Sequence, residues 1–403
     1  MRDLRGKFLL VEKQTPAGRD LPKCVPLQSC DARLLDKEME ASEQKRTIVV
    51  TGGTGGIGFH SALGLARTGA RVLVTGRDAS RGEEARRLIA EESGNARVEL
   101  VVGDVSSIAG VDALASELLG RVDRLDVLVN NVGYFGNELR TSEDGLEMHF
   151  AVNVLSPWRL TYALLPALRA ADNARVLNLT AGDNSPGAPV PIDADNLQAE
   201  KGFKGLMTMA HSKSVMEAMS IVLARELGSD GITVNIVFPG RASTTLTRSV
   251  SLSGLPGAMK LFWPCLKLLF RDDGGKGAAR ASASTIWCAT HADVKSVTGC
   301  FLFCERRTDG QTGTVGGAIS PTNSQSPNSV RPRLPRGGFG CYVGCLTKRL
   351  TASTGGYFGQ DSKRLEPHPT SMDASVQARI VALIEAAAPT PNRCASGGEL
   401  GNS

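Results

Sequence analysis

The sequence predicts a doubly wound α/β fold, in which a single parallel sheet of the Rossmann type carries helices on both faces. Short runs rich in Val, Ile and Leu alternate with longer helical segments from residue 46 onward. Several of these runs are apolar at nearly every position, which is typical of strands that are buried on both faces. A glycine-rich turn also joins the first strand to the first helix, as in nucleotide-binding members of this fold class.

The first strand, turn and helix form the most informative unit. A β-branched strand at Thr47–Val50 is followed by the glycine-rich run Thr51–Gly58 and by a helix through Phe59–Ala66. Such a run lets a pyrophosphate approach bare backbone at the positive end of a helix. The glycine pattern alone is weak, and its place between a strand and a helix favours a dinucleotide site over an ordinary loop.

The remaining elements follow in the same alternating order. We expect strands at Arg71–Thr75, Val98–Val102, Leu125–Val129, Arg175–Leu179 and Thr233–Val237. We expect helices around Arg81–Glu92, Gly110–Leu119, Glu143–Ala171 (two helices), Met207–Leu227 and Ala374–Ala387, the last of them capped by Asp373.

Composition limits the classes of function. The 403 residues allow one large domain with appendages or two domains, and 41% apolar content is enough for a sizeable core. A net charge of +5 is too small and too scattered to suggest a nucleic-acid partner. Nine irregularly spaced cysteines fit a reducing compartment. No apolar run approaches the ~18–20 residues of a membrane span. Residues 1–45 lack the pattern of a signal peptide and are expected to form a disordered leader, so we expect a cytoplasmic protein.

Besides the glycine-rich run, the chain contains Asp104-Val105 after the third strand, Asn130-Asn131-Val132-Gly133 at the end of the fourth and Pro239-Gly240-x-x-x-Thr244 after the sixth. Together these separated motifs resemble those of the short-chain dehydrogenase/reductase family, in particular its branch of retinol dehydrogenases and related lipophilic-carbonyl reductases. The resemblance extends over about residues 46–299 and 355–388, which would form one domain. The motifs include Asn130-Asn131-Val132-Gly133, in which Val132 departs from the family pattern. The cofactor-binding residues that the resemblance implies are Gly52, Gly56, Ile57, Gly58, Arg77, Asp104, Val105, Asn130, Gly133, Lys213, Pro239, Gly240 and Thr244.

The end of the second strand indicates which nicotinamide cofactor is used. A site that prefers NAD places a carboxylate there to bond the ribose 2′-hydroxyl. In this sequence Gly76 takes that position and Arg77 follows it. Because a guanidinium offers a fork of donors that matches a phosphate, we expect NADP(H). The alternative is a solvated loop arginine that Asp78 neutralises locally.

The expected catalytic centre departs from the family. The resemblance implies a Ser, a Tyr and a Lys that act together, with an Asn that holds a proton-relay water. Lys213 and Asn153 match two of these positions, but Met209 replaces the Tyr and Ala181 replaces the Ser. Methionine has no ionisable proton and alanine has no side-chain donor. Since a positioned general acid contributes about 10²–10⁴-fold, activity by the family mechanism should be severely weakened.

Two functions therefore stay open. One is an NADP(H)-dependent oxidoreductase that acts on a lipophilic carbonyl or alcohol with an altered proton donor. The other is a nucleotide-binding pseudoenzyme or scaffold. His211 is a weak substitute donor, because it lies about 200° around the helix from Lys213. Thr180 or Asp183 would need a loop shift, and a substrate-assisted or water-borne proton is a further alternative.

Segments outside the strands and helices complete the prediction. Leu255–Phe270 is rich in bulky apolar residues and could be a substrate lid, packed core or a peripheral membrane contact.

Residues 300–354 are expected to form a disordered insert, because they lack periodicity. Joining Gly299 to Gly356 would restore the family pattern, in which the last strand of the sheet directly follows the preceding helix. The cysteine pairs of this insert have spacings that zinc sites allow but lack their surroundings, and no metal is predicted. Residues 389–403 should be a frayed tail, and the resemblance implies a possible homo-oligomer.

Overall fold

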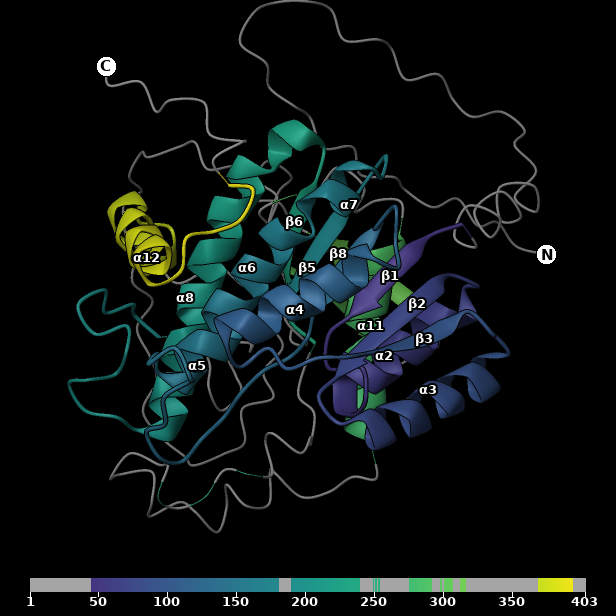
Figure 1. The fold of residues 1–403 in the computed structure, drawn as a ribbon, viewed down its shortest axis with the longest axis horizontal. Coiled ribbons are helices and arrows are strands. Elements are labelled where there is room, and N and C mark those ends of the chain that lie inside the picture. The colour runs from purple at the N-terminus through teal and green to yellow at the C-terminus, as the bar shows by residue number, and fades with distance from the viewer. Residues whose placement is uncertain are drawn as a thin grey trace, which may run out of the picture.

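The computed structural model of the chain contains one sheet, covered by helices on both faces (Figure 1). It describes residues 45–180, 190–239, 249, 251, 253, 275–291, 298, 301–306, 312–316 and 369–393. Within this part eight strands lie in the order β3-β2-β1-β4-β5-β6-β7-β8, all parallel except β8. They are β1 (Thr47–Val50), β2 (Arg71–Gly76), β3 (Val98–Val102), β4 (Val127–Asn130), β5 (Arg175–Leu179), β6 (Thr233–Val237), β7 (Phe301–Arg306) and β8 (Thr312–Gly316). The predicted fold class is confirmed.

The helices connect successive strands and form the two outer layers. They are α2 (Gly56–Arg67), α3 (Ala79–Ser93), α4 (Ile108–Leu119), α5 (Met148–Phe150), α6 (Ser156–Ala163), α7 (Leu165–Arg169), α8 (Gly205–Glu226), α11 (Lys276–Thr290) and α12 (Ala374–Ala387). A π-helical turn, η1 (Ala151–Leu155), joins α5 to α6, and the single turns η2 (Gly228–Asp230) and η6 (Pro369–Ser371) follow α8 and precede α12. None of the helices in the described ranges is long and apolar enough to cross a membrane.

The strands feed two separate cores because successive side chains alternate between the faces of the sheet. Val49, Leu73 and Leu128 belong to the core beneath α4, α6 and α8. Their neighbours Val50 and Val74 belong to the core beneath α2 and α11. All five side chains are fully buried, which explains why the strands read as continuous apolar runs.

One expectation about the C-terminal third differs from the structure. β7 and β8 fall inside residues 300–354, and Phe301 and Leu302 pair with Ile236 and Val237 of β6. β7 is the next described element after α11 and pairs with β6, the strand that precedes this helix, because consecutive elements of a sheet are usually adjacent in space. The segment from Gly356 that was expected to supply the last strand lies outside the described residues, as do residues 317–354, the leader up to residue 44 and the segment 255–270.

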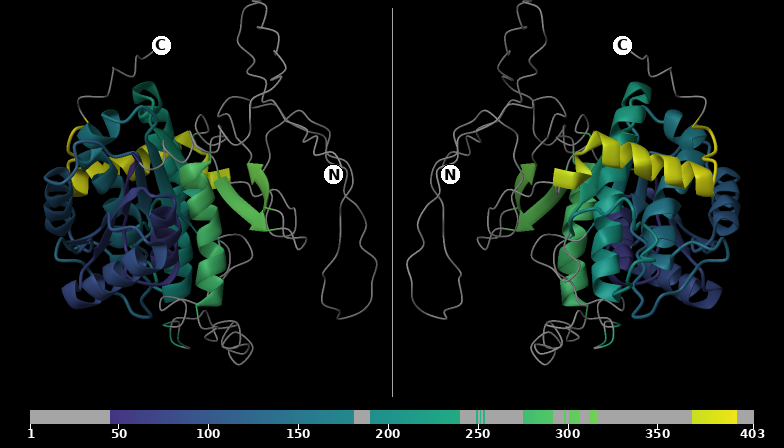
Figure 2. Two further views of the ribbon diagram at one scale, coloured as in Figure 1. Left: turned by 90° about the vertical axis from the view of Figure 1, so that its right-hand side faces the viewer. Right: turned by 90° about the vertical axis from the view of Figure 1, so that its left-hand side faces the viewer.

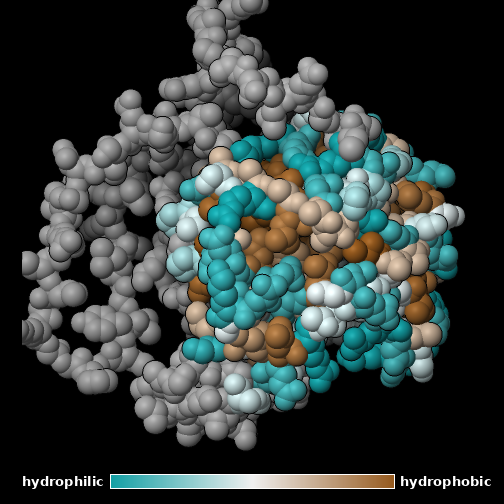
Figure 3. All heavy atoms as spheres, turned by 60° about the vertical axis from the view of Figure 1, so that its left-hand side comes forward, coloured by the Kyte–Doolittle hydropathy of each residue, from teal (hydrophilic) through white to brown (hydrophobic). Residues whose placement is uncertain are grey.

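The start of the expected frayed tail is anchored. Trp158 donates its indole N–H to Thr390 Oγ1 at 2.9 Å, and Arg159 donates to the Pro389 carbonyl at 2.8 Å. Arg393 contacts Glu226 at 2.9 Å. Residues 389–393 therefore continue α12 across α6 and α8, on the side of the molecule seen at the right of Figure 2. Near the middle of this side, apolar residues gather within a largely hydrophilic surface (Figure 3).

Candidate active site

The glycine-rich turn between β1 and α2 is shaped by backbone that requires glycine. Gly52 and Gly56 have φ angles of +63° and +54°, in the left-handed region that L side chains rarely adopt. A Cβ on Gly58 would lie 2.3 Å from the Gly52 carbonyl oxygen and 2.4 Å from Asn131 Nδ2. The first turn of α2 can therefore pack directly over the preceding loop only because residue 58 has no side chain.

Asn131 fixes this turn to the end of β4. Its side-chain Nδ2 donates to the Thr51 carbonyl at 2.8 Å and to the Gly52 carbonyl at 3.3 Å. Its backbone N–H donates to Thr51 Oγ1 at 2.9 Å. The sequence placed Asn131 in a motif but did not single it out as a site residue, because its role depends on contacts that cross about 80 residues of chain.

The turn fits a dinucleotide phosphate. The first hydrogen bond of α2 runs from the Phe59 N–H to the Gly55 carbonyl, so the N–H groups of Gly56, Ile57 and Gly58 precede the helical ladder. The first turn of the helix contains no acidic residue. Free N–H groups at the positive end of a helix, beside glycines that leave the backbone bare, suit a pyrophosphate.

Four other predicted cofactor residues, all of them described, lie at the carboxyl ends of strands. Arg77 is exposed directly after β2, and Asp104 is exposed after β3, where its carboxylate accepts the Ser106 N–H at 2.9 Å. Val105 beside it is buried. Pro239 is buried after β6, whereas Gly240 and Thr244 lie outside the described residues.

The two remaining predictions on β4 have different surroundings. Gly133 is half-buried in the segment that follows the strand. Asn130 is buried in the sheet, where its Nδ2 donates to Asn178 Oδ1 on β5 at 2.8 Å. Its side chain thus joins two strands, and Asn131 is the residue of this pair that contacts the glycine-rich turn.

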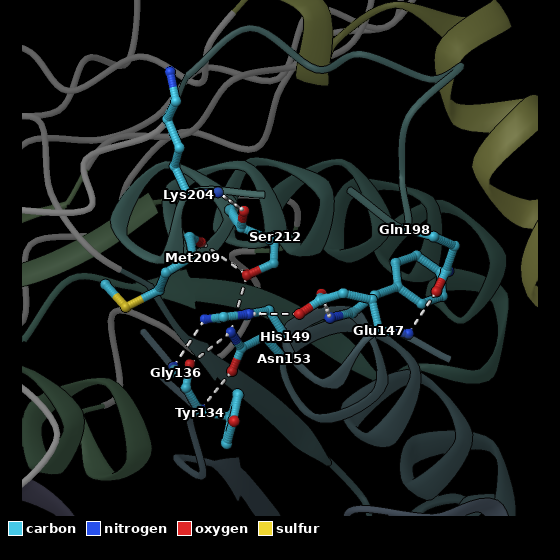
Figure 4. Close-up of polar contacts among 11 residues, drawn as sticks. Tyr134, Gly136, Glu147, His149, Asn153, Gln198, Lys204, Met209 and Ser212 are labelled. Atoms are coloured by element: carbon cyan, nitrogen blue, oxygen red, sulfur yellow. Dashed lines mark hydrogen bonds and ion pairs between the residues drawn. The ribbon is translucent and has the colours of Figure 1, made fainter. Parts of the chain in front are cut away.

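Asn153 occupies the π-helical turn η1, an irregularity that is frequent at functional sites. Its Oδ1 accepts the Tyr134 N–H at 2.7 Å, and its Nδ2 donates to Ser212 Oγ of α8 at 2.9 Å (Figure 4). Ser212 Oγ in turn donates to the Met209 carbonyl at 2.7 Å. Asn153 therefore links the segment after β4 to the helix that carries the expected catalytic residues.

A buried histidine lies beside Asn153, and the sequence did not reveal it. His149 Nε2 accepts the Gly136 N–H at 3.1 Å, and its Nδ1 lies 2.6 Å from Glu147 Oε1. These two contacts occupy both ring nitrogens (Figure 4). His149 therefore shapes the wall of the site and has no nitrogen left for a substrate.

Met209 and Lys213 lie one turn apart on α8, as predicted. Met209 is buried, takes part in the polar network only through its carbonyl, and extends its sulfur away from Asn153 (Figure 4). Lys213 Nζ donates to the Leu179 carbonyl, at the carboxyl end of β5, at 2.9 Å. Burial lowers the pKa of Lys213 from 10.5 to about 8, and the nearby carboxylate of Glu217 partly opposes this shift.

Glu217 is a second group that the sequence did not reveal. It lies one helical turn beyond Lys213, is fully buried, and accepts the Thr180 hydroxyl at 2.7 Å. One turn further, Ser220 Oγ accepts the Asn178 amide at 2.8 Å. This stripe of polar side chains on α8 docks the helix on the end of β5. Thr180, considered as a substitute donor, is engaged in that contact, while Ala181 and Asp183 lie outside the described residues.

His211 does not face Lys213, in agreement with the helical geometry. Its Nε2 accepts the Asp193 N–H at 2.9 Å, in the segment before α8, and burial lowers its pKa. No group of three or more His, Cys, Asp or Glu residues in the described segments could hold a metal ion.

Comparisons with known proteins agree with this geometry. Residues 52–258 match a short-chain dehydrogenase family model described as "Enoyl-(Acyl carrier protein) reductase". The chain is 31% identical to retinol dehydrogenase 12 of Mus musculus over 65% of its own length and 78% of that protein. It is 32% identical to retinol dehydrogenase 13 of Homo sapiens over 56% of its own length and 68% of that protein. An uncharacterised protein from Mycobacterium paratuberculosis shares the fold, with a TM-score of 0.56, 21% identity, and coverage of 86% of this chain and 94% of that one. The chain belongs to the short-chain dehydrogenase/reductase family of NAD(P)-dependent oxidoreductases.

Proposed function

We propose that the protein is an NADP(H)-dependent oxidoreductase that interconverts a lipophilic carbonyl compound and its alcohol with an altered proton donor. One observation carries the choice of cofactor. Gly76 stands where an NAD site places its acid, and a Cβ there would lie 2.5 Å from Thr54 Cγ2, so an acid at this position would require the Thr54 side chain to move. Arg77, the next residue, is exposed, and the Asp78 carboxylate caps α3 by accepting the Arg81 N–H at 2.9 Å.

The residues present assign the parts of such a reaction. The N–H groups of Gly56, Ile57 and Gly58 would hold the pyrophosphate, and Lys213 would hold the nicotinamide ribose, as in the family. When bound, the cofactor supplies or accepts the hydride at the substrate carbon. The proton on the substrate oxygen cannot come from Met209. We propose that it comes from water in contact with Lys213, whose pKa of about 8 allows proton exchange near neutral pH.

The substrate class rests on the relatives. The most similar curated proteins include retinol dehydrogenases, whose names describe a lipophilic alcohol as substrate. The apolar segment 255–270, the predicted lid, lies outside the described residues. A lipophilic carbonyl or alcohol is therefore proposed from the family branch.

Met209 favours a second candidate, a nucleotide-binding protein without catalytic activity. A buried thioether at the position of the expected acid can neither donate a proton nor stabilise an alkoxide. Such a protein would retain the glycine-rich turn at the start of α2 as a nucleotide site. It would respond to a bound nucleotide by a change in its shape or in its partner.

Turnover separates the two candidates. We expect NADPH to bind the full chain in calorimetry, and a panel of lipophilic aldehydes and ketones to oxidise it slowly. A Met209→Tyr, Ala181→Ser double variant, which restores the family residues, should turn over roughly 10²–10⁴-fold faster. If both proteins bind NADPH and only the double variant shows any turnover, the oxidoreductase proposal is wrong and the second candidate holds.

A further inference from the structure

Lys213 has surroundings that set it apart from the other lysines that the structure describes. Those four are all exposed, namely Lys45, Lys201, Lys204 and Lys276. Lys213 is half-buried on α8, and its Nζ donates to the Leu179 carbonyl at 2.9 Å. The amine therefore lies at the carboxyl end of β5, the edge of a parallel sheet at which ligands bind, and is still partly open to solvent.

The amine of Lys213 forms no ion pair within the described part of the chain. Its acceptor is a neutral backbone carbonyl, which a neutral amine can contact as well as an ammonium can. Glu217, one turn further on α8, is fully buried and accepts the Thr180 hydroxyl at 2.7 Å. It acts on Lys213 through its charge alone, which only partly opposes the effect of burial.

The balance of these effects leaves much of the Lys213 side chain in its reactive form. Only a neutral amine is a nucleophile, and burial lowers the pKa of Lys213 to about 8. At pH 7.5 about a quarter of such amines are neutral, against about one in a thousand at the ordinary pKa of 10.5. Desolvation of this kind is the means by which proteins activate lysine for attack on carbonyl groups.

The residue one turn before Lys213 offers no group that competes for a carbonyl compound. Met209 lies on the same face of α8, and its sulfur extends away from Asn153 (Figure 4). Its thioether cannot protonate a carbonyl oxygen. Ser212 is engaged with Asn153 Nδ2 at 2.9 Å and with the Met209 carbonyl at 2.7 Å. A carbonyl group beside Met209 would therefore meet the amine and no side-chain acid from these residues.

We propose that Lys213 binds a lipophilic aldehyde covalently, as an imine, when no dinucleotide occupies the site. The proposal rests on the substrate class of the proposed function and does not require turnover. The nitrogen of Lys213 forms a bond to the carbonyl carbon, and the carbonyl oxygen leaves as water with the two protons that the amine loses. No oxidant or reductant takes part, and water reverses the step. The aldehyde thus occupies the residue that would otherwise hold the nicotinamide ribose.

Reductive trapping tests the imine without catalysis by the protein. The full chain is incubated with decanal and sodium cyanoborohydride at pH 7.5, and the labelled lysines are located by mass spectrometry of its peptides. Cyanoborohydride delivers a hydride to the imine carbon, so the lysine gains the mass of the aldehyde less one oxygen atom. We expect Lys213 to be labelled roughly 10- to 100-fold faster than Lys204, an exposed lysine at the start of the same helix, because far more of it is neutral.

A pair of matched variants and a competing ligand define the site of labelling. Lys213→Arg should remove the fast label, because a guanidinium stays protonated and is not a nucleophile at this pH. Lys204→Arg is the matched control and should leave the labelling of Lys213 unchanged. Saturating NADP+ should slow the labelling of Lys213 by at least about 10-fold, since it leaves few sites free. The labelling of Lys204 should not respond to NADP+.

The outcomes separate this proposal from the proposed function. Labelling of Lys213 that is no faster than that of Lys204 overturns the imine. If decanal oxidises NADPH in the presence of the chain and Lys213 is not labelled, the oxidoreductase stands and the imine is wrong. If Lys213 is labelled rapidly and calorimetry detects no NADPH binding, the imine stands and the proposed cofactor is wrong. Rapid labelling in the presence of bound NADP+ would overturn the competition of the two ligands for Lys213.

Discussion

At the scale of single residues, three side chains of α8 define the candidate site. Met209 and Lys213 occupy the positions expected from the sequence, one turn apart on α8. Glu217, one turn further, adds a buried carboxylate beside the lysine. The motif predicted Met209 and Lys213 because it spans consecutive residues, whereas the importance of Glu217 follows from its contact with Thr180 across 37 residues of chain.

The lowered pKa of Lys213 predicts how the affinity for the cofactor depends on pH. Burial lowers it to about 8, so the ammonium is lost as the pH rises through about 8 and not through 10.5. The affinity for NADPH, measured between pH 6 and pH 10, should therefore fall around pH 8. Glu217→Gln removes the negative charge that favours the ammonium, so the midpoint should move to lower pH.

Two further variants control this prediction. Lys213→Met should show weaker binding without the step near pH 8. Thr180→Val removes the hydrogen bond to Glu217 and keeps the carboxylate, so its midpoint should move less than that of Glu217→Gln. A midpoint that is the same in Glu217→Gln and in the native chain would contradict the role of the carboxylate.

At the scale of elements, the turn and helix at the start of the sheet were predicted with nearly correct limits. The last helix, Ala374–Ala387 with its Asp373 cap, was predicted to the residue, and its prediction is confirmed. Strong local signals explain this success: a capping side chain and an apolar periodicity lie within a few residues. Between Glu143 and Ala171 the local pattern predicted two helices, but the chain there divides into α5, η1, α6 and α7, because packing around Asn153 decides the irregular turn.

The close packing of α2 on its turn predicts the effect of a single methyl group. Gly58→Ala places a Cβ 2.3 Å from the Gly52 carbonyl oxygen, so helix and turn must separate. We expect destabilisation by about 1–3 kcal/mol, typical of overpacking, together with loss of NADPH binding. Gly228→Ala, where no atom lies within 4 Å of the new Cβ, is the matched control and should leave both unchanged. Urea unfolding and calorimetry measure the two effects. If Gly58→Ala binds NADPH as tightly as the native chain, the glycine-rich turn between β1 and α2 does not hold the dinucleotide.

At the scale of the whole molecule, the C-terminal residues contact helices that lie much earlier in the chain. Arg393 contacts Glu226 at 2.9 Å and Glu385 at 3.1 Å, and its guanidinium lies 5.4 Å from the centre of the Trp158 ring. Together with α12, this segment covers part of α6 and α8.

The same contacts predict a contribution to stability. Arg393→Met removes the guanidinium that Glu226 and Glu385 share, and leaves them only their hydrogen bonds from Tyr162 and Thr390, while their side chains are 29% and 30% exposed. We expect a loss of about 1–2 kcal/mol in the free energy of unfolding, because partly buried carboxylates lose charge-assisted hydrogen bonds. Arg379→Met breaks an ion pair whose side chains are 56% and 64% exposed, and should cost less than about 0.5 kcal/mol. Equal losses in urea unfolding would show that the C-terminal contact does not stabilise the fold.

The sequence by itself determined the alternation of strands and helices, the glycine-rich turn and the spacing of Met209 and Lys213 on one helix, because each depends on residues that are close together in the chain. Only the tertiary structure decided that Lys213 meets the Leu179 carbonyl, that β7 completes the parallel part of the sheet and that Thr390 meets Trp158 across 232 residues. These contacts depend on how the elements rotate and pack against one another, and no local pattern of residues encodes that arrangement.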